Sequence, residues 1–230
     1  MSGPLLELRD LRVEFPSRHG TLRALDGVSF DVAPGEILGL VGESGAGKSL
    51  TGAAIIGLLE PPGRLFGGQV LLEGRRIDDL PREALRRLRG RRIGAIFQDP
   101  ADLARSAAID RAPAGGDAAH NLVVVRYVAD DVGVMYLGRM VELAPRAELF
   151  PAPRHPHTRM LLAAVPDLRG RNRERVPVLG EVPDTLAPPS GCAFHPRCPH
   201  ANERCRVERP ILRPSGAVQV ACHAVEEGRI

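Results

Sequence analysis

The sequence predicts an α/β fold organised around one phosphate-binding loop, followed by a small cysteine-rich C-terminal module. Three observations predict it. Residues 42–49 read Gly-Glu-Ser-Gly-Ala-Gly-Lys-Ser and fill every fixed position of the pattern G-x-x-x-x-G-K-S. The apolar run 37–41 leads into this loop as a strand, and the stretch 49–59 leads out of it as a helix. All four cysteines lie within the last 39 residues.

The residue types in the loop suit the binding of a nucleotide's phosphates. Its glycines let successive backbone N–H groups turn inward around the β-phosphate, and the N-terminus of the following helix points there too. Lys48, the only lysine in the chain, would reach the β and γ oxygens, and the Ser49 hydroxyl would ligate Mg²⁺. An accidental glycine-rich turn is the alternative, which the order of strand, loop and helix disfavours. The predicted binding residues are Gly42, Glu43, Ser44, Gly45, Ala46, Gly47, Lys48 and Ser49.

Composition excludes several classes of function. The chain of 230 residues carries a formal charge of only +3 and 3% aromatic residues, so no nucleic-acid partner is expected. Arginine clusters at 86–92 and 169–175 suit a solvated face, or contact with anionic lipid headgroups or an acidic partner. Because the first residues show no signal-peptide pattern and no apolar run reaches about 18 residues, we expect a cytosolic protein unless a partner holds it at a membrane.

Apolar patterning and turn residues predict the remaining elements in chain order. Pro34-Gly35-Glu36 makes the turn before the strand of the loop, and Pro61-Pro62-Gly63 interrupts the chain after its helix. Gln98 follows the last predicted strand at its carboxyl end, where side chains can meet a nucleotide. Strands are predicted over residues 5–15, 21–32, 37–41, 69–72 and 93–97, and helices over 49–59 and 81–88.

Longer motifs resemble a known family. The loop, Ile96-Phe97-Gln98-Asp99-Pro100 and residues 134–142 (Val-Met-Tyr-Leu-Gly-Arg-Met-Val-Glu) closely resemble the ATP-binding subunits of ABC transporters. His155-Pro156-His157-Thr158 resembles the His-Pro-Tyr-Thr element of the dipeptide and oligopeptide importers, with His157 in place of the usual Tyr. The tail 191–199 (Gly-Cys-Ala-Phe-His-Pro-Arg-Cys-Pro) resembles the same subfamily.

The resemblance implies a fold and a division into domains. It implies a P-loop NTPase core of the ABC type over residues 1–150, with a reduced helical subdomain. It also implies a peptide-transporter C-terminal region with a four-cysteine module over residues 151–230.

The same resemblance implies roles for three residues outside the loop. Phe15 would stack on adenine, Gln98 would sense the γ-phosphate and Mg²⁺, and His120 would be the switch histidine. Asn121 stands where the family usually has Asp. A core phenylalanine and a loop histidine are the alternatives for Phe15 and His120. The implied partners are transmembrane permease subunits and a second ATP-binding subunit, in a homo- or heterodimer attached peripherally to the cytoplasmic face of the membrane.

The segment between Gln98 and His120 departs from the family. The family places a helical subdomain, an LSGGQ signature, and a Walker B strand ending in Asp-Glu there, but only 21 residues are present. Residues 101–119 are mostly Ala, Asp, Arg, Gly and Pro and predict a loop. Residues 123–131 could instead supply a Walker B strand, yet their apolar residues recur at helical spacing. A missing central strand would also leave its neighbours in the sheet uncovered.

The four cysteines predict a ligand centre. Their order is Cys192-x5-Cys198-x6-Cys205-x16-Cys222. Disulfides are disfavoured in a reducing compartment, and all-cysteine zinc sites usually contain closer pairs. The resemblance implies a [4Fe–4S] cluster, with Zn²⁺ and unligated thiols as the alternatives.

These observations predict an ATP-binding subunit of a peptide importer in which ATP is bound with Mg²⁺ and hydrolysis is impaired. It would be an ATPase by resemblance, but it has no identifiable Walker B carboxylates or signature. The competing hypothesis is a non-catalytic, internally deleted protein that acts only as an interaction partner or has no function.

Overall fold

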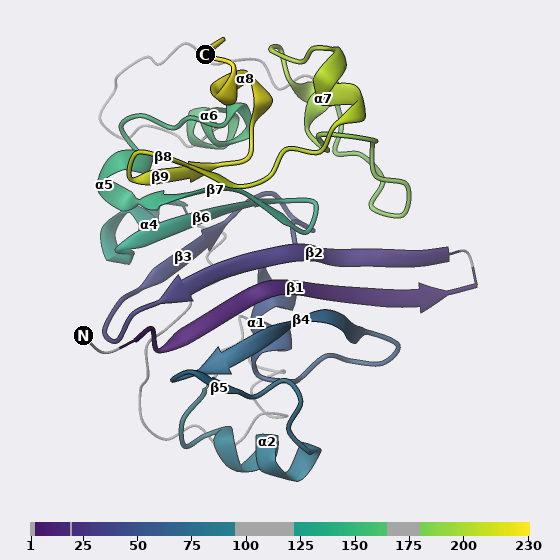
Figure 1. Ribbon diagram of the computed structural model, residues 1–230, viewed down its shortest axis with the longest axis vertical. Helices are drawn as coiled ribbons and strands as arrows, with labels where there is room; N and C mark the ends of the chain where they lie inside the picture. Colours follow the sequence, from purple (N-terminus) through teal and green to yellow (C-terminus); the bar gives the residue numbers. More distant parts are fainter. Residues whose placement is uncertain (1–2, 19, 95–121, 165–179) are drawn as a thin grey trace.

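The structure is a computed structural model that describes residues 3–18, 20–94, 122–164 and 180–230 (Figure 1). Its first sheet is antiparallel. β1 (Leu6–Ser17) and β2 (Gly20–Val32) form a long hairpin, β4 (Arg64–Leu72) pairs with the other edge of β1, and β5 (Arg75–Arg76) completes the order β2-β1-β4-β5. One face of this sheet is apolar and fully buried, because the strands alternate between core and solvent.

The second sheet contains the strand that precedes the phosphate loop. This strand, β3 (Leu38–Val41), pairs in parallel with β6 (Asp131–Tyr136), which pairs antiparallel with β7 (Arg139–Pro145). The tail hairpin of β8 (Arg213–Ser215) and β9 (Val218–Val220) continues the sheet, because β9 pairs with β7. The order is β3-β6-β7-β9-β8. The C-terminal tail, by which we mean residues 180–230 from here on, and the phosphate loop are therefore attached to one sheet.

Within the described residues, β3 is the last strand of its sheet and β6 is its only strand partner. The strand that the sequence analysis expects to be missing would cover this edge. Residues 95–121, where the chain departs from the family, lie outside the described part, so that expectation stays a prediction.

Helices cover the sheets at several points. α1 (Lys48–Ile55) starts one residue before the predicted helix and ends four residues earlier, because Gly57 takes a left-handed φ of 65°. α2 (Arg82–Leu88) confirms the prediction for 81–88. The others are α4 (Leu122–Val128), α5 (Arg146–Leu149), α6 (Pro156–Ala163), the 3₁₀ turn η1 (His195–Arg197), α7 (Glu203–Val207) and α8 (His223–Glu226).

The helix α4 decides between two interpretations of residues 123–131. Residues 122–128 are helical, and β6 starts only at Asp131. The Walker B interpretation needs a strand that ends in two carboxylates, whereas here Asp130 precedes β6 and Asp131 is its first residue. The helical interpretation is therefore confirmed, and the Walker B alternative is wrong.

The strands predicted over residues 5–15, 21–32, 37–41 and 69–72 are confirmed, whereas the strand predicted over 93–97 stays a prediction. The strand expected at 69–72 starts earlier, at Arg64. Of the strand expected at 93–97, only the first two residues are described, and Ile93 makes an isolated bridge with Arg89.

The core has two main apolar clusters. One lies over β1, β2 and β4 and also holds Leu40 and Met135 from the second sheet. The other joins β6 and β7 to the tail, where Phe194 and Val218 pack on them. The tail thus contributes side chains to the core itself. No helix in the described part of the chain is long and apolar enough to cross a membrane.

Candidate nucleotide site

The phosphate loop is shaped by glycines at points of close approach. Gly42 has a φ of 153°, and a Cβ there would lie 2.3 Å from the carbonyl oxygen of Met135 in β6. Gly47 has a φ of 103°, and a Cβ there would lie 2.7 Å from Leu25. Only glycine fits both conditions, so the loop can turn tightly between β3 and α1.

Lys48 is the first residue of α1 and is 4% exposed. Its Nζ donates hydrogen bonds of 2.9 Å to the carbonyl oxygens of Gly42 and Glu43. Burial lowers the pKa of Lys48. The Thr51 hydroxyl donates at 2.9 Å to the Gly47 carbonyl and fixes the loop to the helix. The ammonium group therefore lies inside the loop, close to where the sequence analysis expects phosphate.

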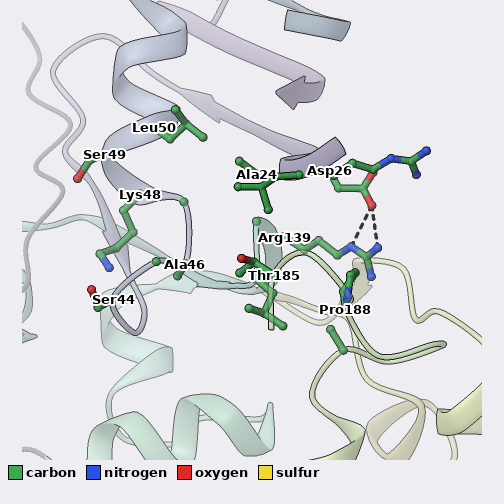
Figure 2. A pocket seen from close by; sticks show the side chains of 17 residues that line it. Ala24, Asp26, Ser44, Ala46, Lys48, Ser49, Leu50, Arg139, Thr185 and Pro188 are labelled. Atoms are coloured by element: carbon green, nitrogen blue, oxygen red, sulfur yellow. Dashed lines mark hydrogen bonds and ion pairs between the residues drawn. The ribbon is translucent and has the colours of Figure 1, made fainter. Parts of the chain in front are cut away.

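A cavity of about 510 Å³ lies beside the loop (Figure 2). Its walls come from four parts of the chain: β2, the loop with the start of α1, the turn between β6 and β7, and the tail. On the far side from Lys48, Arg139 donates to the Asp26 carboxylate at 2.7 and 3.2 Å. The lining residues are Leu22, Arg23, Ala24, Asp26, Ser44, Gly45, Ala46, Gly47, Lys48, Ser49, Leu50, Leu137, Gly138, Arg139, Thr185, Pro188 and Ala193.

Most predicted loop residues line this cavity, and the others lie close by. Ser44 to Ser49 are in its wall, and Ser49 is exposed, so its hydroxyl is open to a metal ion held with phosphate. Gly42 and Glu43 are not in the wall, but their carbonyl oxygens accept the hydrogen bonds of Lys48 Nζ. Phe15 does not line it; a Cβ on Gly63 would lie 2.5 Å from the Phe15 ring, and the ring packs on the first core cluster.

Two predicted site residues, Gln98 and His120, lie outside the described residues. Their roles stay predictions, as does adenine stacking by Phe15.

The structure adds a contact that the sequence analysis missed. Arg197, in η1 of the tail, donates from Nη1 to Glu43 Oε2 at 2.7 Å and from Nη2 to Oε1 at 3.0 Å. His157 Nε2 lies 3.8 Å from the same carboxylate, within ion-pair range but too far for a hydrogen bond. His157 and Arg197 hold the pKa of Glu43 at about 2. Since burial lowers the pKa of His157, Arg197 is the permanent countercharge.

Two known families match most of the chain. The ABC transporter family matches residues 25–144, and the family described as oligopeptide/dipeptide transporter, C-terminal region, matches residues 141–205. This chain belongs to the ATP-binding subunits of peptide ABC transporters.

Similar curated proteins agree with this assignment. The oligopeptide transport ATP-binding protein AppF of Bacillus subtilis is 31% identical, with 95% of this chain and 97% of AppF covered. A probable peptide ABC transporter ATP-binding protein of Sinorhizobium fredii, y4tS, is 33% identical, with 97% and 90% covered. The di/tripeptide transport ATP-binding protein DppF of Pseudomonas aeruginosa is 31% identical, with 91% and 92% covered.

The likeness to a solved structure is limited in extent. The dimeric bacterial ABC transporter cassette MJ0796 is 26% identical with a TM-score of 0.37, over 40% of this chain and 38% of that chain.

The alignment with AppF is also longer than this ATP-binding subunit. It spans 322 residues, whereas the subunit has 230. AppF therefore contains residues that have no counterpart here.

The peptide-transporter element of the subunit is built around buried histidines. Glu142, fully buried in β7, accepts from the backbone N–H groups of Arg154 at 2.8 Å and His155 at 3.0 Å. His155 caps α6 by accepting from the His157 N–H at 3.0 Å, and burial lowers the pKa of His155 to about 3. This cap directs His157 against Tyr136 and Phe194, where neither ring nitrogen finds a hydrogen-bond partner among the residues that the structure describes.

The four cysteines of the subunit come close to one another without pairing. All are free thiols; Cys205 and Cys222 are buried, and Cys192 and Cys198 are half-buried. Burial, together with the smaller effect of charge on the other three cysteines, raises the pKa of Cys192 to about 12. However, no three His, Cys, Asp or Glu residues in the described part are arranged to hold a metal. The donor types fit a thiolate-bound metal, but the thiols as placed do not form its ligand set.

Proposed function

We propose that this subunit binds ATP·Mg²⁺ at residues 42–49 and serves in the import of dipeptides or oligopeptides. The observation that carries the proposal is the buried Lys48 ammonium, held inside a glycine-shaped loop beside a cavity of about 510 Å³. A lysine bonded to loop carbonyls can exchange them for the charged oxygens of a nucleotide, which are stronger acceptors. Ser49 and, by resemblance, Gln98 would hold the Mg²⁺.

The proposed partners follow from the family. Curated relatives are described as oligopeptide and di/tripeptide transport ATP-binding proteins. We propose that the subunit works with transmembrane permease subunits and a second ATP-binding subunit, attached peripherally at the cytoplasmic face of the membrane. No nucleic-acid partner is proposed, because the net charge is only +3.

Hydrolysis is proposed to be impaired. Only 21 residues separate Gln98 from His120, and the alignment with AppF shows that relatives carry residues this chain lacks. Without a carboxylate to orient water and a signature to complete the site, phosphoryl transfer loses its positioning groups. A non-catalytic interaction partner is the second candidate function, favoured by the same short segment.

Titration calorimetry with ATP·Mg²⁺ tests the binding proposal. The parent chain should bind, and Lys48→Ala should lose at least about 100-fold in affinity because its charge contacts the β and γ oxygens. Arg87→Ala, on the exposed face of α2, is the control and should bind as the parent does. Equal binding by the parent and Lys48→Ala would remove the phosphate-loop assignment.

A turnover assay tests whether hydrolysis is impaired. Phosphate release by the isolated chain should stay at background, and Gln98→Ala and His120→Ala should not lower it further. Turnover well above background that falls in either variant would mean that hydrolysis is intact.

For the tail we propose a thiolate-bound centre, with [4Fe–4S] ahead of Zn²⁺, supported by the four free thiols and by the family resemblance of residues 191–199; binding would have to draw the thiols into a ligand set that they do not form in the structure. Anaerobic purification should give a brown protein with broad absorbance near roughly 400 nm, weakened by any single Cys→Ser change. A colourless protein with about one equivalent of zinc would replace the cluster by zinc, and a metal-free protein would end both assignments.

A further inference from the structure

One side chain of the tail reaches the phosphate loop. Arg197 lies between Cys192 and Cys198 in sequence, and its side chain is only 3% exposed. Both terminal nitrogens donate to the Glu43 carboxylate, in a two-point pairing that a lysine could not make. The contact joins residues 154 positions apart in the chain.

The Arg197 side chain is held from several directions. Nη1 lies 3.4 Å from the Tyr136 hydroxyl, and Nη2 lies 3.7 Å from the sulfur of Met160. The guanidinium group also lies 5.9 and 5.8 Å from the ring centroids of Tyr136 and Phe194. Because its surroundings are packed core residues, Arg197 can fix the position of whatever it binds.

Glu43 connects Arg197 to Lys48, because it is bonded to both. Its carboxylate is held by Arg197, and its main-chain carbonyl accepts from Lys48 Nζ at 2.9 Å and from the Ala46 N–H at 3.1 Å. The chain of contacts runs from the tail through one loop residue to the cation that would meet phosphate.

A second, independent observation places the tail at the same site. Thr185, Pro188 and Ala193 line the cavity beside the loop. In Figure 2 the segment with Thr185 and Pro188 faces the Arg139 side of the cavity, opposite Lys48. The tail therefore reaches both the carboxylate of the loop and the wall of the cavity.

We propose that the cysteine-containing tail is a positioning element of the nucleotide site, in which Arg197 fixes the phosphate loop through Glu43 and the docked tail strengthens ATP binding. The inference rests on the proposed function, because it concerns the affinity of the same loop for ATP. Arg197 itself does not touch the nucleotide and acts through Glu43.

Calorimetric ATP·Mg²⁺ titrations on the full chain test this with four variants. Arg197→Gln and Glu43→Gln should each weaken ATP binding by about tenfold. The double variant should bind no less tightly than the single variant with the lower affinity, because each substitution breaks the same Arg197–Glu43 contact. Arg197→Lys should lose less than Arg197→Gln. Arg204→Gln is the matched control, since the ion-pair partners of Arg204 within the described residues are carboxylates of the tail (Glu208, Glu226 and Glu227), and it should bind within about twofold of the parent.

Glu43→Gln separates positioning from simple neutralisation. If Arg197 only cancelled a negative charge beside phosphate, Glu43→Gln would bind as well as the parent and would restore binding to Arg197→Gln; this result would overturn the proposal. Equal affinity in the parent and in a folded Arg197→Gln would overturn it too. Should Arg197→Gln not fold, Glu43→Gln and Arg197→Lys decide alone. A parent that binds no ATP would instead refute the proposed function.

Discussion

The two sides of the phosphate loop are built differently. On the side of β6, the loop meets a continuous sheet, two buried histidines, Phe194 and the tail, with Arg197 bonded to Glu43. On the other side, β3 has no further strand within residues 3–18, 20–94, 122–164 and 180–230. The family places its catalytic elements in the part of the chain that is short here.

This difference separates holding a nucleotide from hydrolysing it. Lys48 is held by the carbonyl oxygens of Gly42 and Glu43, and the Glu43 carboxylate is held by Arg197 of the tail and lies within ion-pair range of His157 of α6. All of these residues lie outside the short segment 101–119. A chain could therefore lose the catalytic side and keep a well-formed loop.

The largest effect is expected where the loop meets β6. Gly42→Ala should lower the free energy of unfolding by about 4 kcal/mol, because its Cβ would overlap the Met135 carbonyl and its φ of 153° disfavours a side chain. Gly45→Ala is the control, since a Cβ there meets nothing within 4 Å and only its φ of 77° is unfavourable, at a cost of about 1 kcal/mol. Urea unfolding of both variants measures this, and similar losses would contradict the close approach.

Removal of the tail's main aromatic contact should cost slightly less. Phe194 is 2% exposed and packs on Tyr136 and His157, so Phe194→Ala should lose about 3 kcal/mol in the same assay. Leu186→Ala, 51% exposed in the same tail, should stay within about 0.5 kcal/mol of the parent. If Phe194→Ala were as mild as Leu186→Ala, the tail would not be part of the core.

Local patterns were enough to predict the loop and its neighbours. The alternating strands β1 and β2, the order of β3, loop and α1, and the helix α2 follow from residues close in sequence. The Arg197–Glu43 pair joins distant residues, and nothing in the periodicity of either segment indicates it. Its one signal was an arginine beside a cysteine in the tail motif, which carried no assigned role.

The C-terminal region illustrates the same limit. The sequence predicts a four-cysteine ligand centre for this region. The structure shows that the tail also shares the core of β6 and β7, through Phe194 and Val218. Strand pairing between β7 and β9 depends on contacts across the chain, which sequence spacing does not specify.

The smallest effect concerns the start of β6, beside the strand of the loop. Burial, a hydrogen bond with Glu36, and the charges of Glu36 and Asp130 raise the pKa of Asp131 to about 6. Between about pH 4 and 6 the folded chain then holds more protons than the unfolded chain, so stability falls as the pH rises through this range.

Asp131→Asn should remove this pH dependence and add stability at pH 7, because the neutral amide avoids the cost of ionising the carboxylate in the folded chain. The gain should be only about 1 kcal/mol, because Asp131 is partly exposed to solvent, which screens the charge. Asp79→Asn makes the same change at an exposed position and should follow the parent profile. Unfolding midpoints between pH 4 and 8 give the comparison, and a parent-like slope for Asp131→Asn would be inconsistent with the raised pKa.

Amide hydrogen exchange with and without ATP·Mg²⁺ tests most directly whether the loop and the tail form one site. If Arg197 links them, nucleotide should slow exchange in peptides covering residues 42–49 and also in those covering residues 192–198, because coupling between two sites is reciprocal. In Lys48→Ala neither region should change. Protection of the loop alone, with the tail peptides of the parent unaffected by ATP, would contradict the account.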